Sequence, residues 1–245
     1  MKAVAAWLAV YLLALLVMMP AKVLYWIPLP AGVSIAQAQG SLWQGSLGRV
    51  QVQQMLLQDL SWDWDLWALF GGQLQARVEL PAQNNPVAFA SQISLGFNQL
   101  NLQDLRASGT LAPLMQLTDI RLPLKTRGNW TLAVDQFALS EPSVNHWCDD
   151  LQGNARGINI QVQVNNVWQS LGDFPLQLGC QQPGLVSLQM NGNNSLGLTL
   201  EGAINSSSVA AAGTVKPGPE TPAALAELFT FLGRPDNQGR YPFSL

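Results

Sequence analysis

Alternation of apolar and polar side chains with a period of two runs through much of the chain. The clearest example is residues 73–80, where Leu74, Ala76, Val78 and Leu80 alternate with amide and charged side chains. Residues 56–65 and 158–165 repeat the pattern; in the former, Leu56, Leu60, Trp62 and Trp64 are expected to share one face. Successive side chains of a β-strand point to opposite faces, so this spacing predicts half-buried strands.

Further strands are predicted between Gly, Asn and Pro residues that suit hairpins and short loops. They cover residues 33–39, 47–52, 87–95, 129–135, 176–180, 185–190, 196–200 and 209–215. Two segments look helical instead: a short turn at 66–70, and residues 222–232, where Thr221 can serve as N-cap and Gly233 ends the helix. We therefore predict a mostly β fold, a long curled antiparallel sheet forming a groove or an open barrel, with one peripheral helix near the C-terminus.

An uncharged run of 19 residues, from Ala3 to Ala21, precedes the strands. As a helix it would span roughly 28 Å, the thickness of a bilayer core. The next small-x-small cleavage site, at residues 36–38, lies far downstream of the run. The run therefore predicts an uncleaved transmembrane signal-anchor.

The predicted anchor occupies residues 1–27, with Pro28 and Pro30 ending its helix. The remaining residues, 28–245, contain no second apolar run of comparable length and are predicted to form one all-β domain. Lys2 and the N-terminal amine favour a cytoplasmic N-terminus, which would place that domain in the periplasm, while Lys22 on the far flank of the run weakens this charge bias.

The chain has two cysteines, Cys148 and Cys180. In an oxidising compartment they would close a loop of about 33 residues and stabilise the fold by roughly 3 to 4 kcal/mol. The alternative is a pair of buried free thiols in a cytosolic domain. Together with the anchor, the pair favours a disulfide in a bacterial periplasm.

Charge and composition remove several classes of function. Charged residues make up 11% of the chain, and 12 Lys and Arg stand against 15 Asp and Glu without a basic cluster. A nucleic-acid binder needs a positive surface, so nucleic acid is not an expected partner. One histidine and two cysteines are too few for most zinc sites, and we predict neither a metal nor a cofactor.

Two groups of residues could carry catalysis. His146 and Cys148 would share a strand face, within reach for thiolate activation or metal ligation, unless a disulfide removes the thiolate. Asp59, Asp63 and Asp65 lie on one face of a predicted strand, an arrangement similar to the paired carboxylates of glycosidases. The simpler interpretation is that they form the solvent-exposed face of an amphipathic strand. We therefore predict no catalytic residue and no enzyme.

The candidate binding surface is apolar. Trp62 and Trp64 share one face of a predicted strand, and Leu74 and Val78 share the corresponding face of the next. Such a face could be core, the lining of a lipid groove, or a surface for a protein partner, and its pattern does not choose among them. These four residues are the predicted apolar groove or partner surface.

Five short segments follow the predicted anchor in a fixed order: GSLWQG at 40–45, LSWDW at 60–64, the strand at 74–80, LNLQDLRASG at 100–109 and GRYPF at 239–243. Taken together and in this order, they resemble the protein N family of the bacterial type II secretion system over essentially the whole chain. The resemblance implies a single-pass inner-membrane accessory component with a periplasmic domain and no catalytic residue. Its partners would be other secretion components, in the inner-membrane platform or the secretin.

The strand and Gly-Trp patterning is also similar to larger envelope proteins of the AsmA kind, whose curled sheets form apolar grooves. We therefore predict a non-enzymatic inner-membrane component of type II secretion that acts by binding and scaffolding in the periplasm. The alternative is an AsmA-like module that binds lipid or another hydrophobic ligand. A third class, a cell-envelope hydrolase, requires His146 or the aspartates to be essential.

Overall fold

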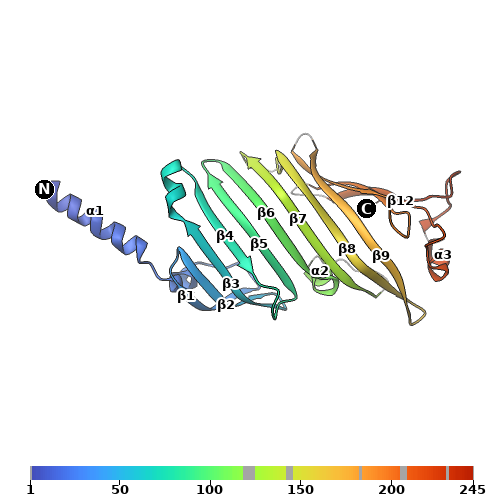
Figure 1. Cartoon of the computed structure of the whole chain (residues 1–245), viewed down its shortest axis with the longest axis horizontal. Coiled ribbons are helices and arrows are strands. Elements are labelled where there is room, and N and C mark those ends of the chain that lie inside the picture. Colours follow the sequence, from blue (N-terminus) through green and yellow to red (C-terminus); the bar gives the residue numbers. More distant parts are fainter. Residues whose placement is uncertain are drawn as a thin grey trace. The chain divides into compact units, whose positions relative to one another are not determined.

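The computed structural model describes residues 2–117, 125–141, 146–181, 184–204, 209–229 and 232–244. Within these residues, thirteen strands form an open sheet whose order follows the sequence from β1 to β13 (Figure 1). Neighbouring strands whose register is defined run antiparallel. The predicted mostly β, antiparallel fold is therefore confirmed. The chain divides into two compact units, Met1–Ser94 and Leu95–Leu245.

The first unit combines an N-terminal helix with the first strands of the sheet. Its elements are α1 (Lys2–Val17), the 3-10 helix η1 (Ala21–Trp26), β1 (Val33–Gly40), β2 (Gln44–Val52), β3 (Met55–Asp65), the 3-10 helix η2 (Leu66–Gly71), β4 (Leu74–Leu80) and most of β5 (Val87–Gly96). The predicted alternation at 73–80 is present, because Ala76 and Leu80 are buried while the residues between them are more exposed. The turn predicted at 66–70 is η2.

The helix α1 ends at Val17, well before the predicted end at Pro28. Pro20 explains the difference, since proline has no backbone N–H and disfavours the helical conformation in the residue before it. The 16 residues of α1 rise by roughly 24 Å. Among the residues that the structure describes, no helix meets the combined length and hydropathy expected of a membrane span.

The apolar face of β3 changes phase at Asp59, whose φ of 60° is left-handed. Alternation predicts that Leu56 shares the inner face with Leu60, but Leu56 is 44% exposed and Leu57 packs against the core instead. A left-handed residue bends the strand and breaks the strict period of two, so the inner face resumes after three residues rather than two. Gln37 in β1, with φ of 59°, has the same conformation.

The second unit contains the remaining strands and two short helices. Its elements are the end of β5, β6 (Gln99–Thr110), α2 (Leu111–Leu117), β7 (Thr126–Ser140), β8 (Asp150–Val164), β9 (Val167–Gln181), β10 (Leu185–Asn191), β11 (Thr199–Ile204), β12 (Val209–Val215), α3 (Ala223–Phe229) and β13 (Tyr241–Ser244). The strand β6 lies outside the strands predicted from alternation, and α2 outside the predicted helices. Residues 230 and 231 of the predicted C-terminal helix lie outside the described residues.

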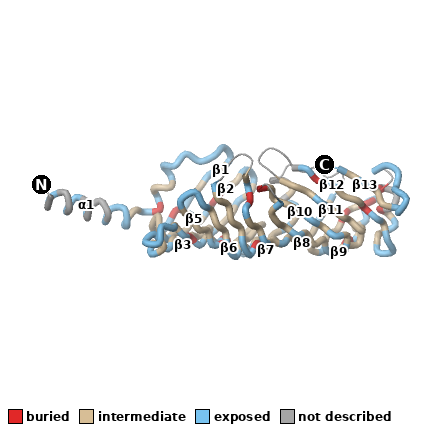
Figure 2. Tube along the Cα trace, turned by 90° about the horizontal axis from the view of Figure 1, so that it is seen from above, coloured by how far each residue is buried: buried red, intermediate tan, exposed pale blue. Residues whose placement is uncertain are grey.

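Within the second unit, β10 to β13 form a layer that faces β8 and β9 (Figure 2). The core between the layers is built from buried side chains of β8, β9, β12 and α3, which are Val162, Val164, Leu171, Val215, Leu225 and Phe229. The predicted C-terminal helix thus exists as α3 and contributes to a core. Thr221, just before it, donates a hydrogen bond to the carbonyl of Ser195 at 2.7 Å, which ties the start of the helix to the turn before β11.

Candidate functional site

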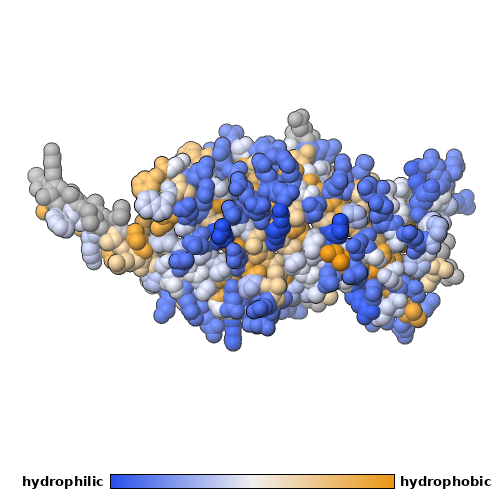
Figure 3. Space-filling model, in the orientation of Figure 1, coloured by the Kyte–Doolittle hydropathy of each residue, from blue (hydrophilic) through white to orange (hydrophobic). Residues whose placement is uncertain are grey.

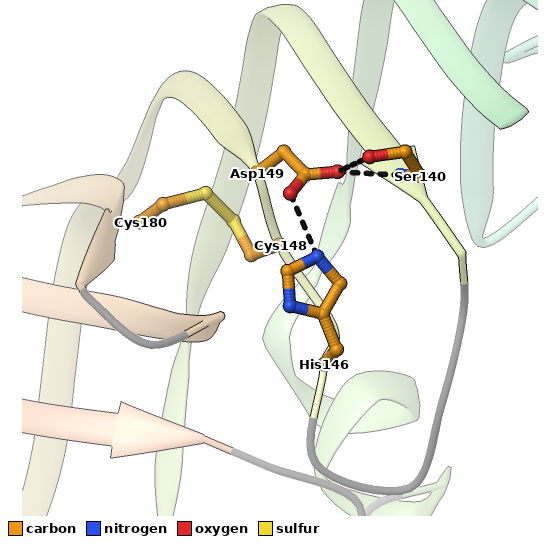
Figure 4. Close-up of a disulfide and its surroundings, with 5 residues drawn as sticks. All are labelled: Ser140, His146, Cys148, Asp149 and Cys180. Carbon is orange, nitrogen blue, oxygen red and sulfur yellow. Dashed lines mark hydrogen bonds and ion pairs between the residues drawn. A yellow bond between two sulfur atoms is a disulfide. The ribbon is translucent and has the colours of Figure 1, made fainter.

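The segment between β7 and β8 carries the only histidine of the chain and one of its two cysteines (Figure 4). Cys148 is 2% exposed and forms a disulfide with Cys180 near the end of β9, with 5.7 Å between the Cα atoms. The predicted bridge is therefore present. Its formation removes the thiolate on which nucleophilic or metal chemistry at Cys148 depends.

Backbone hydrogen bonds hold residues 146–149 of this segment from two sides. The N–H of Trp147 donates to the carbonyl of Gly184 at 2.8 Å, and the N–H of Asp149 donates to the carbonyl of Ala138 at 3.0 Å. Gly184 is required here, because a Cβ at that position would lie 2.6 Å from Nδ1 of His146. The segment is thus bound both to β7 and to the turn between β9 and β10.

Ser140, His146 and Asp149 meet in one polar cluster, drawn in Figure 4. The Ser140 hydroxyl donates to Oδ2 of Asp149 at 2.6 Å, and Nε2 of His146 lies 2.7 Å from Oδ1. The hydrogen bonds from the Ser140 hydroxyl and N–H, with a smaller contribution from His146, hold the pKa of Asp149 below its usual 3.8. The carboxylate is therefore anionic at neutral pH.

The order of groups in this cluster does not suit acyl transfer. In a hydrolytic triad the imidazole contacts the serine hydroxyl and takes its proton, while the carboxylate lies behind the imidazole. Here Asp149 lies between Ser140 and His146, so the imidazole has no hydrogen bond to the hydroxyl. The geometry favours a structural connection between β7 and the segment that precedes β8.

The three aspartates of β3 have local structural roles. Asp59 occupies the left-handed bend, and Asp63 accepts a hydrogen bond from the side-chain amide of Gln44 at 3.3 Å. Asp65 caps η2 by accepting from the N–H of Trp67 at 2.9 Å. All three side chains are exposed, as expected for the solvent-facing side of a strand. Within the described residues, no group of three His, Cys, Asp or Glu could hold a metal ion.

The predicted apolar surface comes together on one face of β3 and β4. Trp62 pairs with Val78 across the two strands, and Trp64 pairs with Ala76, which places Leu74 on the same face two residues further. Trp62 is fixed by a hydrogen bond from Nε1 to the carbonyl of Leu42 at 2.8 Å and packs against the core. Trp64, Leu74 and Val78 are each only partly buried.

A second apolar surface, on η2, is missing from the candidates predicted by alternation. Trp67 is 81% exposed, Phe70 is 87% exposed, and Leu69 between them is 49% exposed. The signal in the sequence is the uncharged run LWALFGG at residues 66–72, which directly follows Asp65. Alternation does not detect it, because the period of two ends with β3.

Comparison with known proteins finds similarity over nearly the whole chain. The family model for type II secretion system protein N matches residues 31–244. Three curated relatives carry the same name, type II secretion system protein N. The relative from Aeromonas hydrophila is 32% identical over 97% of this chain and 94% of its own length; that from Vibrio cholerae serotype O1 is 29% identical over 96% and 93%; that from Klebsiella pneumoniae is 26% identical over 96% and 90%.

No solved structure matches the chain. The family assignment therefore comes from sequence, and the matched residues include all of the strands described above. The full-length relatives cover both units, so the assignment is not confined to one of them. By the family match and by these relatives, the chain belongs to the type II secretion system protein N family.

Proposed function

We propose that this chain is a non-enzymatic accessory component of type II secretion, anchored in the bacterial inner membrane and acting in the periplasm by binding other components of the machine. Membership of the protein N family supports the role in secretion. The anchor, the compartment and the binding mode each have separate support in the structure.

The anchor is residues 1–27, with α1 as its helical part. The described side chains of α1 include apolar residues that are at least half exposed, with Trp7 at 76% and Tyr11 at 61%. The apolar run continues past the helix, where Met18 is 79% exposed. Apolar surface of this kind is costly in water and suited to a lipid environment, which supports insertion of the segment.

The periplasm is the proposed compartment of residues 28–245. The disulfide between Cys148 and Cys180 supports it, since such bonds persist in the bacterial periplasm and are rare in a reducing cytosol. Lys2, before the apolar run, favours a cytoplasmic N-terminus and agrees with that topology.

The observation that carries the binding proposal is the partly exposed apolar face of Trp64, Leu74 and Val78. A protein partner would cover this face and remove its remaining apolar area from water. The β1 edge is a poorer docking site, because the Ala38 N–H already donates to the Tyr25 hydroxyl at 2.7 Å. A bridge between Pro20 and Ser41 occupies the end of the same edge.

Photo-crosslinking in intact cells tests the proposal. A photoreactive amino acid replaces Trp64, and the control replaces Gln75, which is exposed on the opposite face of β4. We expect the Trp64 position to give adducts with other secretion proteins and the Gln75 position to give few. Phospholipid adducts at Trp64 without protein adducts would contradict scaffolding and support the AsmA-like alternative.

A second test addresses the polar cluster. The variant His146→Ala should leave secretion largely intact, because the imidazole contacts the carboxylate of Asp149 and not the hydroxyl of Ser140. The measurement is the amount of secreted protein in the medium, at matched levels of the variant. Loss of secretion with unchanged protein level and thermal stability would overturn the non-enzymatic assignment.

A further inference from the structure

The 3-10 helix η2 displays its largest side chains to solvent. Trp67 and Phe70 have their ring centroids 5.9 Å apart, so the two rings form one tilted pair on the surface. Together with Leu69 they define what we name the η2 surface, residues Trp67, Leu69 and Phe70. Contiguous exposed apolar residues on a folded protein mark a site of interaction with a partner or a membrane.

Local hydrogen bonds hold η2 in this conformation. The carboxylate of Asp65 accepts from the N–H of Trp67 at its start. Gly72 ends it in the left-handed conformation, with φ of 76°, and its N–H bonds back to the carbonyls of Ala68 and Leu69. The exposed rings are therefore carried by a turn that is closed at both ends.

The η2 surface lies at the end of the sheet to which the C-terminal end of α1 is attached. Trp43, in the turn between β1 and β2, donates from Nε1 to the carbonyl of Leu16 at 3.0 Å. Its neighbour Leu42 donates from its N–H to the carbonyl of Met19 at 2.8 Å. The same turn is bonded to the end of β3, because the N–H of Trp64 donates to the carbonyl of Trp43 at 2.8 Å.

Only Asp65 separates Trp64 from the first residue of η2. A short series of hydrogen bonds thus connects the proposed membrane anchor to the η2 surface through one turn of the sheet. Figure 3 shows apolar residues gathered at the position that η2 has in Figure 1, at the upper left of the first unit.

We infer that the η2 surface docks into the headgroup region of the bilayer that holds α1, which seats the first unit on the membrane. This inference rests on the proposed anchor. Trp and Phe are suited to the membrane interface, and residues 66–72 carry no charge that would have to be desolvated. The nearest carboxylate, on Asp65, is directed to the N–H at the base of η2, so a shallow insertion leaves it outside the apolar layer.

The bilayer is favoured over a protein partner by two features. Residues 66–72, which carry the surface, have no polar side-chain group other than the indole N–H of Trp67, whereas a specific protein interface has a polar rim. In addition, its tether to α1 through Trp43 keeps it close to the lipid in every copy of the anchored chain, so docking requires no second binding event.

A site-specific environmental probe tests the docking. Both native cysteines are in the disulfide, so Phe70→Cys adds a single thiol that can carry an NBD fluorophore. The matched control is Gln54→Cys, exposed in the turn just before β3 and hence at the opposite end of that strand from η2. Both full-length variants are reconstituted in phosphatidylethanolamine–phosphatidylglycerol vesicles, with and without lipids that carry a nitroxide near the headgroup.

We expect the label at position 70 to shift to the blue in vesicles and to be quenched by the nitroxide, while the label at position 54 does neither. Flotation of the same vesicles separates this inference from the anchor. A floated chain whose label at position 70 behaves like that at position 54 overturns the docking and leaves the anchor intact. A chain that does not float contradicts both. Phe70 is 87% exposed, so its replacement should not impair folding.

Discussion

The two units of the sheet obtain their cores in different ways. In the first unit the buried cluster is small, with Ala38, Leu47 and Val50 from two strands, and it is completed by Ala21 of η1, which is fully buried. In the second unit the buried cluster comes from β8, β9, β12 and α3. This unit also contains the disulfide between Cys148 and Cys180, which links the segment before β8 to the end of β9. The core of the first unit includes η1, which lies within the C-terminal part of the proposed anchor, whereas the core of the second unit is built from that unit's own strands and helix.

This difference has a consequence for stability. The edge of β1 is covered by non-covalent contacts of η1 and by the bridge between Pro20 and Ser41, so the first unit depends on where the N-terminal segment lies. The second unit carries its cross-link and its larger core within its own residues. Amide hydrogen exchange resolved by segment can follow the two units separately in one sample, since it reports local as well as global opening.

The largest expected effect is that of the disulfide. The double variant Cys148→Ala, Cys180→Ala should lower the free energy of unfolding of the second unit by about 3 to 4 kcal/mol, because the unfolded chain regains the entropy of the open loop. Exchange should accelerate in β8 and β9 and stay unchanged in β1 to β3. Equal acceleration in both units would contradict their separate stabilisation.

Truncation within the second core should have a slightly smaller effect. Leu171 is 5% exposed in β9, and Leu171→Ala should cost about 3 kcal/mol through lost burial and the cavity left behind. Val167, in the same strand, is 57% exposed, and Val167→Ala serves as the control with a cost below about 0.5 kcal/mol. Denaturant unfolding followed by amide exchange measures the free energy of unfolding of both variants. Similar losses of stability in Leu171→Ala and Val167→Ala would mean that the buried cluster of the second unit does not stabilise it.

In the first unit, removing the Tyr25 hydroxyl tests how much η1 stabilises the edge of the sheet. Tyr25→Phe leaves the N–H of Ala38, a residue that is 7% exposed, without its acceptor and should cost about 1 kcal/mol. The control is Tyr11→Phe in α1, where the ring is 61% exposed. Faster exchange should be confined to β1 and β2. An unchanged rate there would show that η1 does not close the edge of the sheet.

The smallest expected effect is on the stability of the second unit at acidic pH. The pKa of Asp149 is lowered in the folded chain, mainly by the Ser140 hydroxyl, so this group stabilises the second unit above its unfolded pKa of 3.8. That contribution is lost as the pH falls through the lower folded pKa. Asp149→Asn should therefore reduce the acid dependence of unfolding in the second unit alone, as measured by melting temperature between pH 2 and 5, roughly the window in which a carboxyl titrates. An unaltered profile would count against the role of the cluster.

Local pattern was sufficient for much of the fold. Alternation at 73–80 predicts β4 because the two faces of a strand meet different surroundings, and that information lies in the strand itself. The disulfide also follows from sequence, because two cysteines allow one pairing. The end of α1 was wrongly predicted at Pro28, although the local effect of Pro20 on a helix was sufficient to indicate the earlier end.

Other features were decided by tertiary structure. The left-handed bend at Asp59, which exchanges Leu56 for Leu57 on the inner face, is set by neighbouring strands as well as by the residue itself. The uncharged run at residues 66–72 indicates an apolar segment, but the exposure of Trp67 and Phe70 depends on whether another element packs over η2. The sequence determined the local conformations and the covalent link, whereas burial and exposure were decided by which segments meet, because those contacts join residues far apart in the chain.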